Sequence, residues 1–203
     1  MRSAPLRPEA PILGFDTSAA HCAAGLFWAG RKMPSRYEEM QRGQAERLMP
    51  MLEELLTEAG LGWRDLGAIG VGTGPGNFTG IRIAVSAARG LALGLGVPAI
   101  GVSSFELQAH GRGDGPLLIT LPAPRGQAYI QRFEGGAPVA APDLIEAGPD
   151  ESAPYDPGTG SLIAEIAARR LAGATAPLPR PAPHYVRPAD AAPMRDAAPV
   201  ILP

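Results

Sequence analysis

Residues suited to phosphate chemistry occur in a short polar segment that follows the first apolar run of the chain. The run Ile12–Phe15 is followed by Asp16, Thr17 and Ser18. An acid at the end of a strand, followed by hydroxyl groups in a tight turn, can hold a metal-bound phosphate. Asp and Ser are also common turn-forming residues. An ordinary hairpin turn therefore explains the same three residues, and both interpretations stay open.

A second candidate for phosphate binding is the glycine-rich segment 72–82, GTGPGNFTGIR, between a predicted strand and a predicted helix. Backbone N–H groups in such a loop, together with a helix N-terminus, form an anion site. The segment lacks the Gly-Lys-Ser/Thr ending of a Walker A loop. A glycine-rich turn that lets two elements pack closely explains it equally well. Its candidate phosphate-contacting residues are Gly74, Gly76, Asn77 and Thr79.

Metal-ligand and nucleophile patterns are not found in the sequence. His21, His110 and His184 are far apart and form no HxxxH pair, and no GxSxG motif occurs. Cys22 lies beside His21, but a small cysteine in an apolar hairpin is more commonly a buried, unreactive residue. The segment DPGTGS at 156–161 could contact an adenosine or a phosphate, but Gly and Ser before a helix are ordinary capping residues, which is the favoured interpretation. We therefore expect no catalytic residue and no metal site.

The elements that would position these segments alternate between strand and helix periodicity. Apolar runs predict strands, and Leu48, Leu52 and Leu55 repeat at helical spacing. The predicted elements are strands at 12–16, 23–28 and 35–40, a helix at 44–59, a strand at 68–72, a helix from an N-cap at Thr79 to about Gly94, a strand at 97–104 and a short helix at 105–110. This order is typical of an α/β unit.

The second half of the chain has a different pattern of predicted elements. Strands are predicted at 117–120 and 128–133, separated by a proline-rich turn at 122–125, and a helix at 161–173. The segment 138–157 reads as a loop, and the tail is too rich in proline for regular structure. We expect a flexible leader at 1–11, an N-terminal lobe at 12–108 and a smaller C-terminal lobe with a proline-rich tail at 109–203.

Composition favours a soluble globular protein. Apolar residues make up 45% of the 203 residues, charged residues 19%, and the net charge is -2. This balance does not provide the clustered cations that grip a polyanion. The lone Cys22 excludes an intramolecular disulfide and favours a reducing cytosol. No apolar run reaches the roughly 18 residues that span a bilayer, so we expect a cytoplasmic protein without a membrane segment.

Four sequence blocks resemble one known family. They are ILGFDTS, QAERLMPML, GVGTGPGNFTGIRI and GLALGLGVPAIGVSS, within residues 12–105, with RGQAY and HYVRP farther on. Together they resemble the TsaB (YeaZ) family, the non-catalytic subunit of the bacterial tRNA threonylcarbamoyladenosine (t6A37) machinery. The resemblance implies an actin-like (ribonuclease H-like) α/β fold in two lobes, the second small and shortened. It also implies that the polar segments described above are a vestigial phosphate site.

The resemblance further implies a scaffold or activator role. The related catalytic subunit, of TsaD type, would carry metal and nucleotide, and a small ATPase of TsaE type would complete an assembly that transfers a threonylcarbamoyl group to N6 of adenosine 37 in ANN-decoding tRNAs. This chain would bind no cofactor tightly, ATP would be used by the complex, and tRNA would be reached through the complex. The alternatives are a free-standing actin-like ATPase or kinase and a metallopeptidase.

The family's contact surface corresponds to the helices at 44–59 and 79–94. The second of these is apolar nearly all round except for the stripe Arg82, Ser86 and Arg89, and such a helix needs covering on more than one side. The lobe's own sheet could supply that cover. The same helices could also pair two copies of the chain in a resting homodimer. The predicted partner interface comprises Leu48, Met49, Leu52, Leu55, Leu56, Arg82, Ile83, Ser86, Ala87, Arg89 and Gly90.

Overall fold

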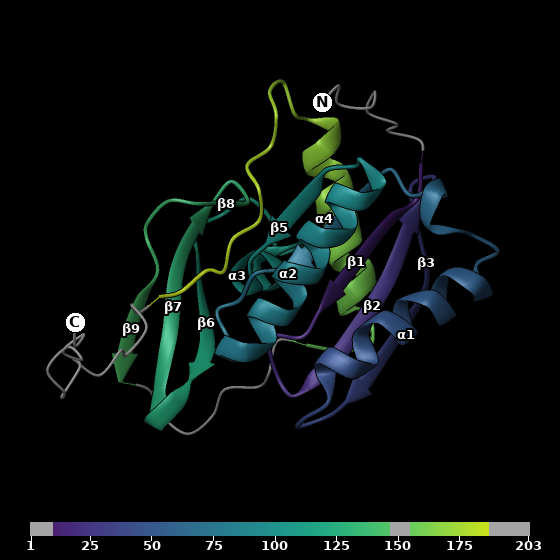
Figure 1. Ribbon diagram of the computed structural model, residues 1–203. Helices are drawn as coiled ribbons and strands as arrows, with labels where there is room; N and C mark the ends of the chain where they lie inside the picture. Colours follow the sequence, from purple (N-terminus) through teal and green to yellow (C-terminus); the bar gives the residue numbers. More distant parts are fainter. Residues whose placement is uncertain (1–9, 147–154, 187–203) are drawn as a thin grey trace, which may run out of the picture.

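The computed structural model describes residues 10–146 and 155–186, which form two β-sheets and four α-helices (Figure 1). Most of the predicted flexible leader, residues 1–9, lies outside the described residues, as does the tail from residue 187 onward. The two sheets have different strand patterns. The first is a mixed sheet and the second is antiparallel.

The first sheet has the strand order β3-β2-β1-β4-β5. β1 pairs antiparallel with β2 and parallel with β4, and β5 runs parallel to β4. Its strands are β1 (Ile12–Asp16), β2 (His21–Trp28), β3 (Arg31–Glu39), β4 (Ala68–Gly72) and β5 (Ala99–Val102). β1 and β4 are buried along their whole length, as is typical of strands covered on both faces.

Helices cover both faces of this sheet. α1 (Gln44–Glu58) and α2 (Phe78–Leu95) lie on one face and α4 (Thr159–Ala172) on the other (Figure 1). Alternate residues of β1 divide between the two layers: Leu13 packs in the core under α1 and α2, and Ile12 packs with α4. On the α4 side, a Cβ atom at Gly14 would overlap the backbone of Gly160. Glycine at this position therefore lets α4 approach the sheet closely.

The helix boundaries follow the sequence prediction with one correction. α1 occupies almost the predicted range. α2 begins at Phe78, and its N-cap is Asn77, whose Oδ1 accepts a hydrogen bond from the Gly80 N–H at 2.9 Å, so the prediction of Thr79 as N-cap was wrong. At the other end, Gly96 has φ 71° and stops α2 in the left-handed conformation that glycine adopts easily.

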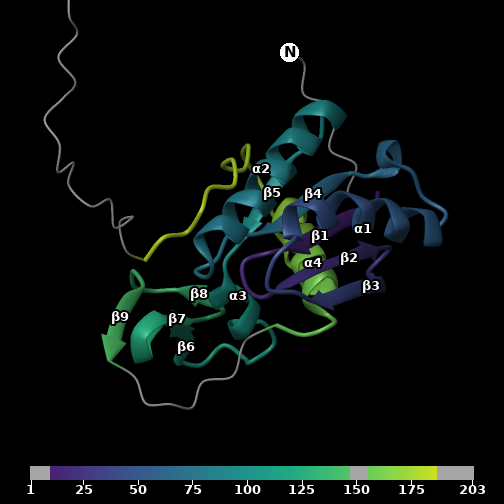
Figure 2. The same cartoon turned by 60° about the horizontal axis from the view of Figure 1, so that its bottom comes forward.

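The second sheet lies beside the first, with α3 (Ser104–Ala109) between them (Figure 2). Its order is β6-β7-β8, and β9 also pairs with β7. The strands are β6 (Leu117–Ala123), β7 (Gln127–Glu134), β8 (Ala137–Pro138) and β9 (Asp143–Glu146). β9 and the second residue of β8 lie in the segment that was predicted to be a loop. β6 continues through Pro122, where a turn was predicted, because proline is tolerated on a strand paired on one side only.

The predicted division at residue 108 also needs correction. α4 was assigned to the C-terminal lobe, but it packs on β1, β2 and β4 of the first sheet. Its buried residues Ala164, Ala167 and Leu171 share a core with Ile12 of β1. The irregular segment 173–186 then connects α4 to the second lobe, where Val186 joins the core of the second sheet. The chain therefore passes from the first lobe to the second twice, once before β6 and again after α4.

Candidate functional site

The two predicted phosphate segments lie directly against each other. The Asn77 N–H donates to the Ser18 carbonyl oxygen at 2.5 Å, and Thr17 Oγ1 donates to the Gly80 carbonyl oxygen at 2.7 Å. A Cβ atom at Gly76 would overlap the Ser18 carbonyl oxygen, and one at Gly80 would overlap that of Thr17. The glycines thus serve close backbone packing between the two segments, whereas Gly76, Asn77 and Thr79 themselves lie at the surface.

The carboxylate of Asp16 is fully enclosed. Oδ1 accepts hydrogen bonds from the N–H and the hydroxyl of Ser18, both at 2.8 Å, and lies 2.7 Å from His21 Nε2. Asp16 is 0% exposed and His21 only 1%. Oδ2 has no hydrogen-bond partner in the described structure, and a Cβ atom at Gly72 would overlap it. These donors compensate one oxygen of a buried carboxylate, and the other faces the close-packed backbone of β4.

Tyr155 closes this cluster from the segment before α4. Its hydroxyl lies 2.8 Å from Ser18 Oγ and 2.7 Å from Ser104 Oγ, and its ring centroid lies 4.5 Å from that of His21. Burial of the hydroxyl raises the pKa of Tyr155, and the nearby Asp16 raises it further. The residue is therefore a neutral phenol that bridges two hydroxyls. Sequence reasoning missed Tyr155, because a tyrosine in a proline-rich loop gives no local signal of such a role.

The remaining candidates for chemistry are structural. Cys22 is fully buried, as predicted, and burial, followed by the charge of Glu38, raises the pKa of its thiol to about 12. In the DPGTGS segment, Asp156 Oδ1 accepts from the Gly158 N–H at 2.7 Å, a contact that closes the turn before α4. Within residues 10–146 and 155–186, no group of three His, Cys, Asp or Glu side chains could hold a metal ion.

The structure corrects the α1 part of the predicted interface. Leu48, Leu52, Leu55 and Leu56 are at most 2% exposed and pack in the core between α1 and the chain's own sheet. They cannot contact a partner in this fold, because the apolar stripe of α1 faces inward. Met49, which is 36% exposed, is the predicted α1 residue that lies at the surface.

The α2 part of the prediction lies mostly at the surface. Arg82, Ser86, Arg89 and Gly90 are exposed, and Ile83 and Ala87 are partly exposed. Leu93, which was not in the predicted set, is 69% exposed and continues the same side of the helix. A Cβ atom added at Gly90 or Gly94 would meet no other atom within 4 Å. On this side of α2 the backbone is therefore covered by small residues alone at these positions.

α2 combines high hydropathy with low burial. By length and composition alone it is long and apolar enough to cross a membrane, as core helices of soluble proteins also are. Only 33% of its residues are buried. It contains no Asp or Glu. We define the helix face as the surface residues Met49 of α1 and Ile83, Ala87, Gly90 and Leu93 of α2.

Comparison with known proteins places this geometry in a family. A family model described as TsaD, tRNA N6-adenosine threonylcarbamoyltransferase, matches residues 37–183. The tRNA threonylcarbamoyladenosine biosynthesis protein TsaB of Escherichia coli is 36% identical over 132 residues, which are 62% of this chain and 57% of that protein. TsaB of Haemophilus influenzae is 38% identical over 99 residues, 49% of this chain and 42% of that protein. The chain belongs to the TsaB (YeaZ) family.

A solved structure supports the assignment over most of the chain. YeaZ from Pseudomonas aeruginosa superposes with a TM-score of 0.69 at 25% identity, covering 87% of this chain and 99% of that one. The chain spans about half the length of the curated TsaB relatives that it matches. The predicted TsaB resemblance is confirmed, and the predicted α/β fold is shared with the YeaZ structure.

Proposed function

We propose that this TsaB-family chain is the scaffold and activator subunit of a tRNA t6A-forming complex. In this proposal it does no chemistry itself and pairs with a TsaD-type catalytic subunit that transfers a threonylcarbamoyl group to N6 of adenosine 37. The names of its relatives support a role in this modification. The observation that carries the pairing is the helix face, the outward side of an apolar helix that is only 33% buried.

The helix face has the properties of a subunit contact. Exposed apolar area that is removed from water contributes about 25 cal/mol per Å². The small residues Ala87 and Gly90 allow the backbone of a second helix to come close. Because the matching family model describes the transferase, a TsaD-type partner would present a related helix pair, and two related surfaces can associate about a pseudo-two-fold axis. The same geometry permits a homodimer as a resting state.

The closed phosphate site supports the division of labour. Asp16, Thr17 and Ser18 are each 0% exposed, so a nucleotide could reach them only if the turn and the loop at 74–80 separated. We infer that metal and nucleotide are held by the catalytic partner and that a TsaE-type ATPase uses ATP in the complex. In the same proposal, tRNA is engaged through the complex in the cytoplasm.

Reconstitution tests this function. Threonylcarbamoyl transfer to tRNA is measured with the TsaD-type and TsaE-type subunits of the same organism, with and without this chain, and size-exclusion chromatography follows complex formation. We expect transfer to depend on the chain and the chain to co-elute with the TsaD-type subunit. Absence of both stimulation and co-elution would refute the proposal.

A substitution on the helix face localises the contact. Ala87→Glu places a charge where an apolar contact is proposed, and an unpaired buried charge costs roughly 3–5 kcal/mol, or about 10² to 10³-fold in affinity. Leu118→Glu is the matched control, because Leu118 is 56% exposed on β6 of the second sheet. We expect only Ala87→Glu to abolish co-elution. Unchanged binding by a folded Ala87→Glu variant would show that the contact lies elsewhere.

A further inference from the structure

Phe78 and Arg82 of the GPGNFTGIR block meet Tyr185, a distant residue of the chain, at the surface of the structure. Arg82 donates from Nε to the hydroxyl of Tyr185 at 2.9 Å, across 103 positions of the chain. The Arg82 guanidinium lies over the Phe78 ring, 3.7 Å from its centroid. The rings of Phe78 and Tyr185 stack with centroids 5.2 Å apart and an interplanar angle of 26°. These three residues form what we call the aromatic–arginine cluster.

The cluster is ordered by its own contacts yet remains at the surface. Phe78 is 41% exposed and Tyr185 is 37% exposed. A free arginine side chain carries about 2 kcal/mol of rotamer entropy, and stacking on a ring together with a bond at Nε reduces that freedom before any ligand binds. The arginine is therefore pre-organised in the isolated chain.

The outer edge of the Arg82 guanidinium is open. Among the described residues, no acid pairs with Arg82, and neither of its terminal amino groups has a hydrogen-bond partner. These two groups form the planar fork that binds an oxyanion with two parallel hydrogen bonds. The ligand class indicated is a carboxylate or a phosphate.

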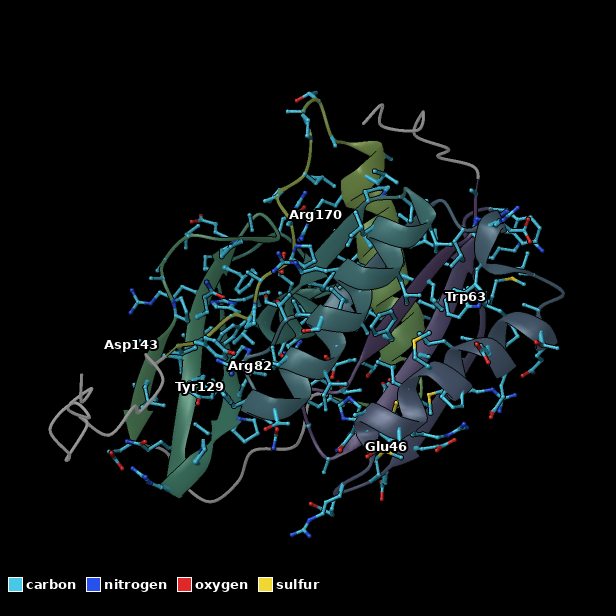
Figure 3. The ribbon with its side chains drawn as sticks, viewed as in Figure 1. Glu46, Trp63, Arg82, Tyr129, Asp143 and Arg170 are labelled. Atoms are coloured by element: carbon cyan, nitrogen blue, oxygen red, sulfur yellow. The ribbon has the colours of Figure 1, made fainter. Side chains whose placement is uncertain are left out.

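The surroundings favour a protein carboxylate over a nucleic-acid phosphate. Binding a nucleic-acid backbone draws its affinity from several cations, but Arg89 is the one other cation on α2. Figure 3 shows Arg82 on the side of α2 toward the second sheet, whereas the exposed Glu46 lies at the start of α1. Arg82 also adjoins Ile83 of the helix face, so the two surfaces are continuous.

We propose that Phe78, Arg82 and Tyr185 form an anchor for an Asp or Glu carboxylate of the protein partner that docks on the helix face. The proposal rests on the proposed function, because it assigns a chemistry to the rim of the same contact. Arginine and aromatic residues that are pre-organised beside an apolar contact are the usual anchors of protein interfaces. The carboxylate accepts two hydrogen bonds from Arg82, while the rings contact the stem of the acidic side chain.

The test compares Arg82 with a matched arginine on the same helix. The dissociation constant for the TsaD-type subunit of the same organism is measured for the wild type and for Arg82→Gln, Arg82→Lys and Arg89→Gln. We expect Arg82→Gln to weaken binding on the order of 30-fold and Arg82→Lys to weaken it nearly as much, because lysine lacks the fork. Arg89→Gln should change the affinity by about threefold or less, as is typical of an exposed charge.

A double-mutant cycle identifies the carboxylate. Acidic residues of the partner are replaced one at a time by the corresponding amide, and each is measured against wild type and Arg82→Gln. One of them should weaken binding to the wild type about as much as Arg82→Gln does and have little further effect in the Arg82→Gln background. If no acidic residue shows this coupling, the carboxylate anchor is wrong.

Other results separate failure of the anchor from failure of the function. If the wild type binds and Arg82→Gln binds within about twofold of it, the anchor is overturned and the proposed function stands. Equal losses for Arg82→Gln and Arg89→Gln would overturn it in favour of general charge attraction. A lower melting temperature of Arg82→Gln, with unchanged affinity of the folded chain for the partner, would overturn the anchor and leave Arg82 with the structural role of holding Tyr185. Weaker tRNA binding with unchanged protein binding would assign the site to RNA. If the wild type forms no complex, both proposals fail.

Discussion

Alanine in place of Gly90 and Gly94 should stabilise the isolated chain, although both glycines lie on the outward side of α2. Both positions are inside the helix, and a Cβ atom at either meets no other atom within 4 Å. Each replacement removes a helix-propensity penalty of about 1 kcal/mol without creating a clash. The double variant should therefore gain about 2 kcal/mol in free energy of unfolding, or roughly 4–8 °C in melting temperature for a chain of this size.

Urea unfolding at low protein concentration measures this gain. Gly96→Ala is the control, because the same methyl group there also meets no atom within 4 Å but must adopt φ 71°. The Gly96→Ala variant should lose about 1 kcal/mol in free energy of unfolding. In contrast, the affinity of the Gly90→Ala/Gly94→Ala variant for the TsaD-type subunit should fall roughly 10-fold, because two methyl groups separate closely packed helices.

The sign of the stability change shows whether this side of α2 is free. A less stable double variant under conditions where the chain is monomeric would show that it is covered within the chain, contrary to the structure. A stability that rises with protein concentration in the wild type and not in the variant would show self-association through the same side. Tighter binding of the variant to the partner would refute the close helix contact.

Four further outcomes concern the buried residues around Asp16 and Cys22. Gly80→Ala should lower the free energy of unfolding by on the order of 3 kcal/mol, because its methyl group overlaps the backbone oxygen of Thr17; a neutral change in urea unfolding would contradict that packing. Tyr155→Phe should lower the free energy of unfolding, measured in urea, by about 1–2 kcal/mol, because two hydrogen bonds are lost. Calorimetry should detect no ATP binding to the wild-type chain. Saturable ATP binding would contradict a closed site. Burial raises the pKa of Cys22 from 9.0 to about 12, so the neutral thiol contributes stability that is present below pH 9 and is lost above it, by up to about 1.4 kcal/mol per pH unit. Cys22→Ala should remove this pH dependence of the free energy of unfolding. Rapid reaction of the folded thiol with a disulfide reagent at pH 8 would argue against its burial.

Several elements were predictable because their signal is local. β1 and β4 have the predicted bounds, and α1 ends one residue before the predicted end. A continuous apolar run or a 3.6-residue period depends on neighbours in the sequence alone. The N-cap of α2 was missed because Asn77 and Thr79 both suit the role. Asn77 takes it because its N–H is bound to the Ser18 carbonyl oxygen, a contact between distant segments.

The position of Pro122 shows a similar limit. Proline after an apolar run is typical of a turn, yet β6 continues through it to Ala123. A strand with one neighbour needs no hydrogen bond from that residue on its free side. Whether a strand lies at the edge of its sheet follows from the sheet order and not from the strand's own residues.

The sequence by itself determined the family, the order of strands and helices through α3, the buried setting of Cys22 and the apolar character of α2, because each depends on a motif or a short-range pattern. Tertiary structure decided which surfaces remain available. It turned Leu52 of α1 inward, returned α4 to the first sheet and brought Tyr155 over Asp16. These outcomes join segments far apart in the chain, and they depend on which packing buries the most apolar area while satisfying buried polar groups. A local pattern of residues does not indicate which of the possible packings this is.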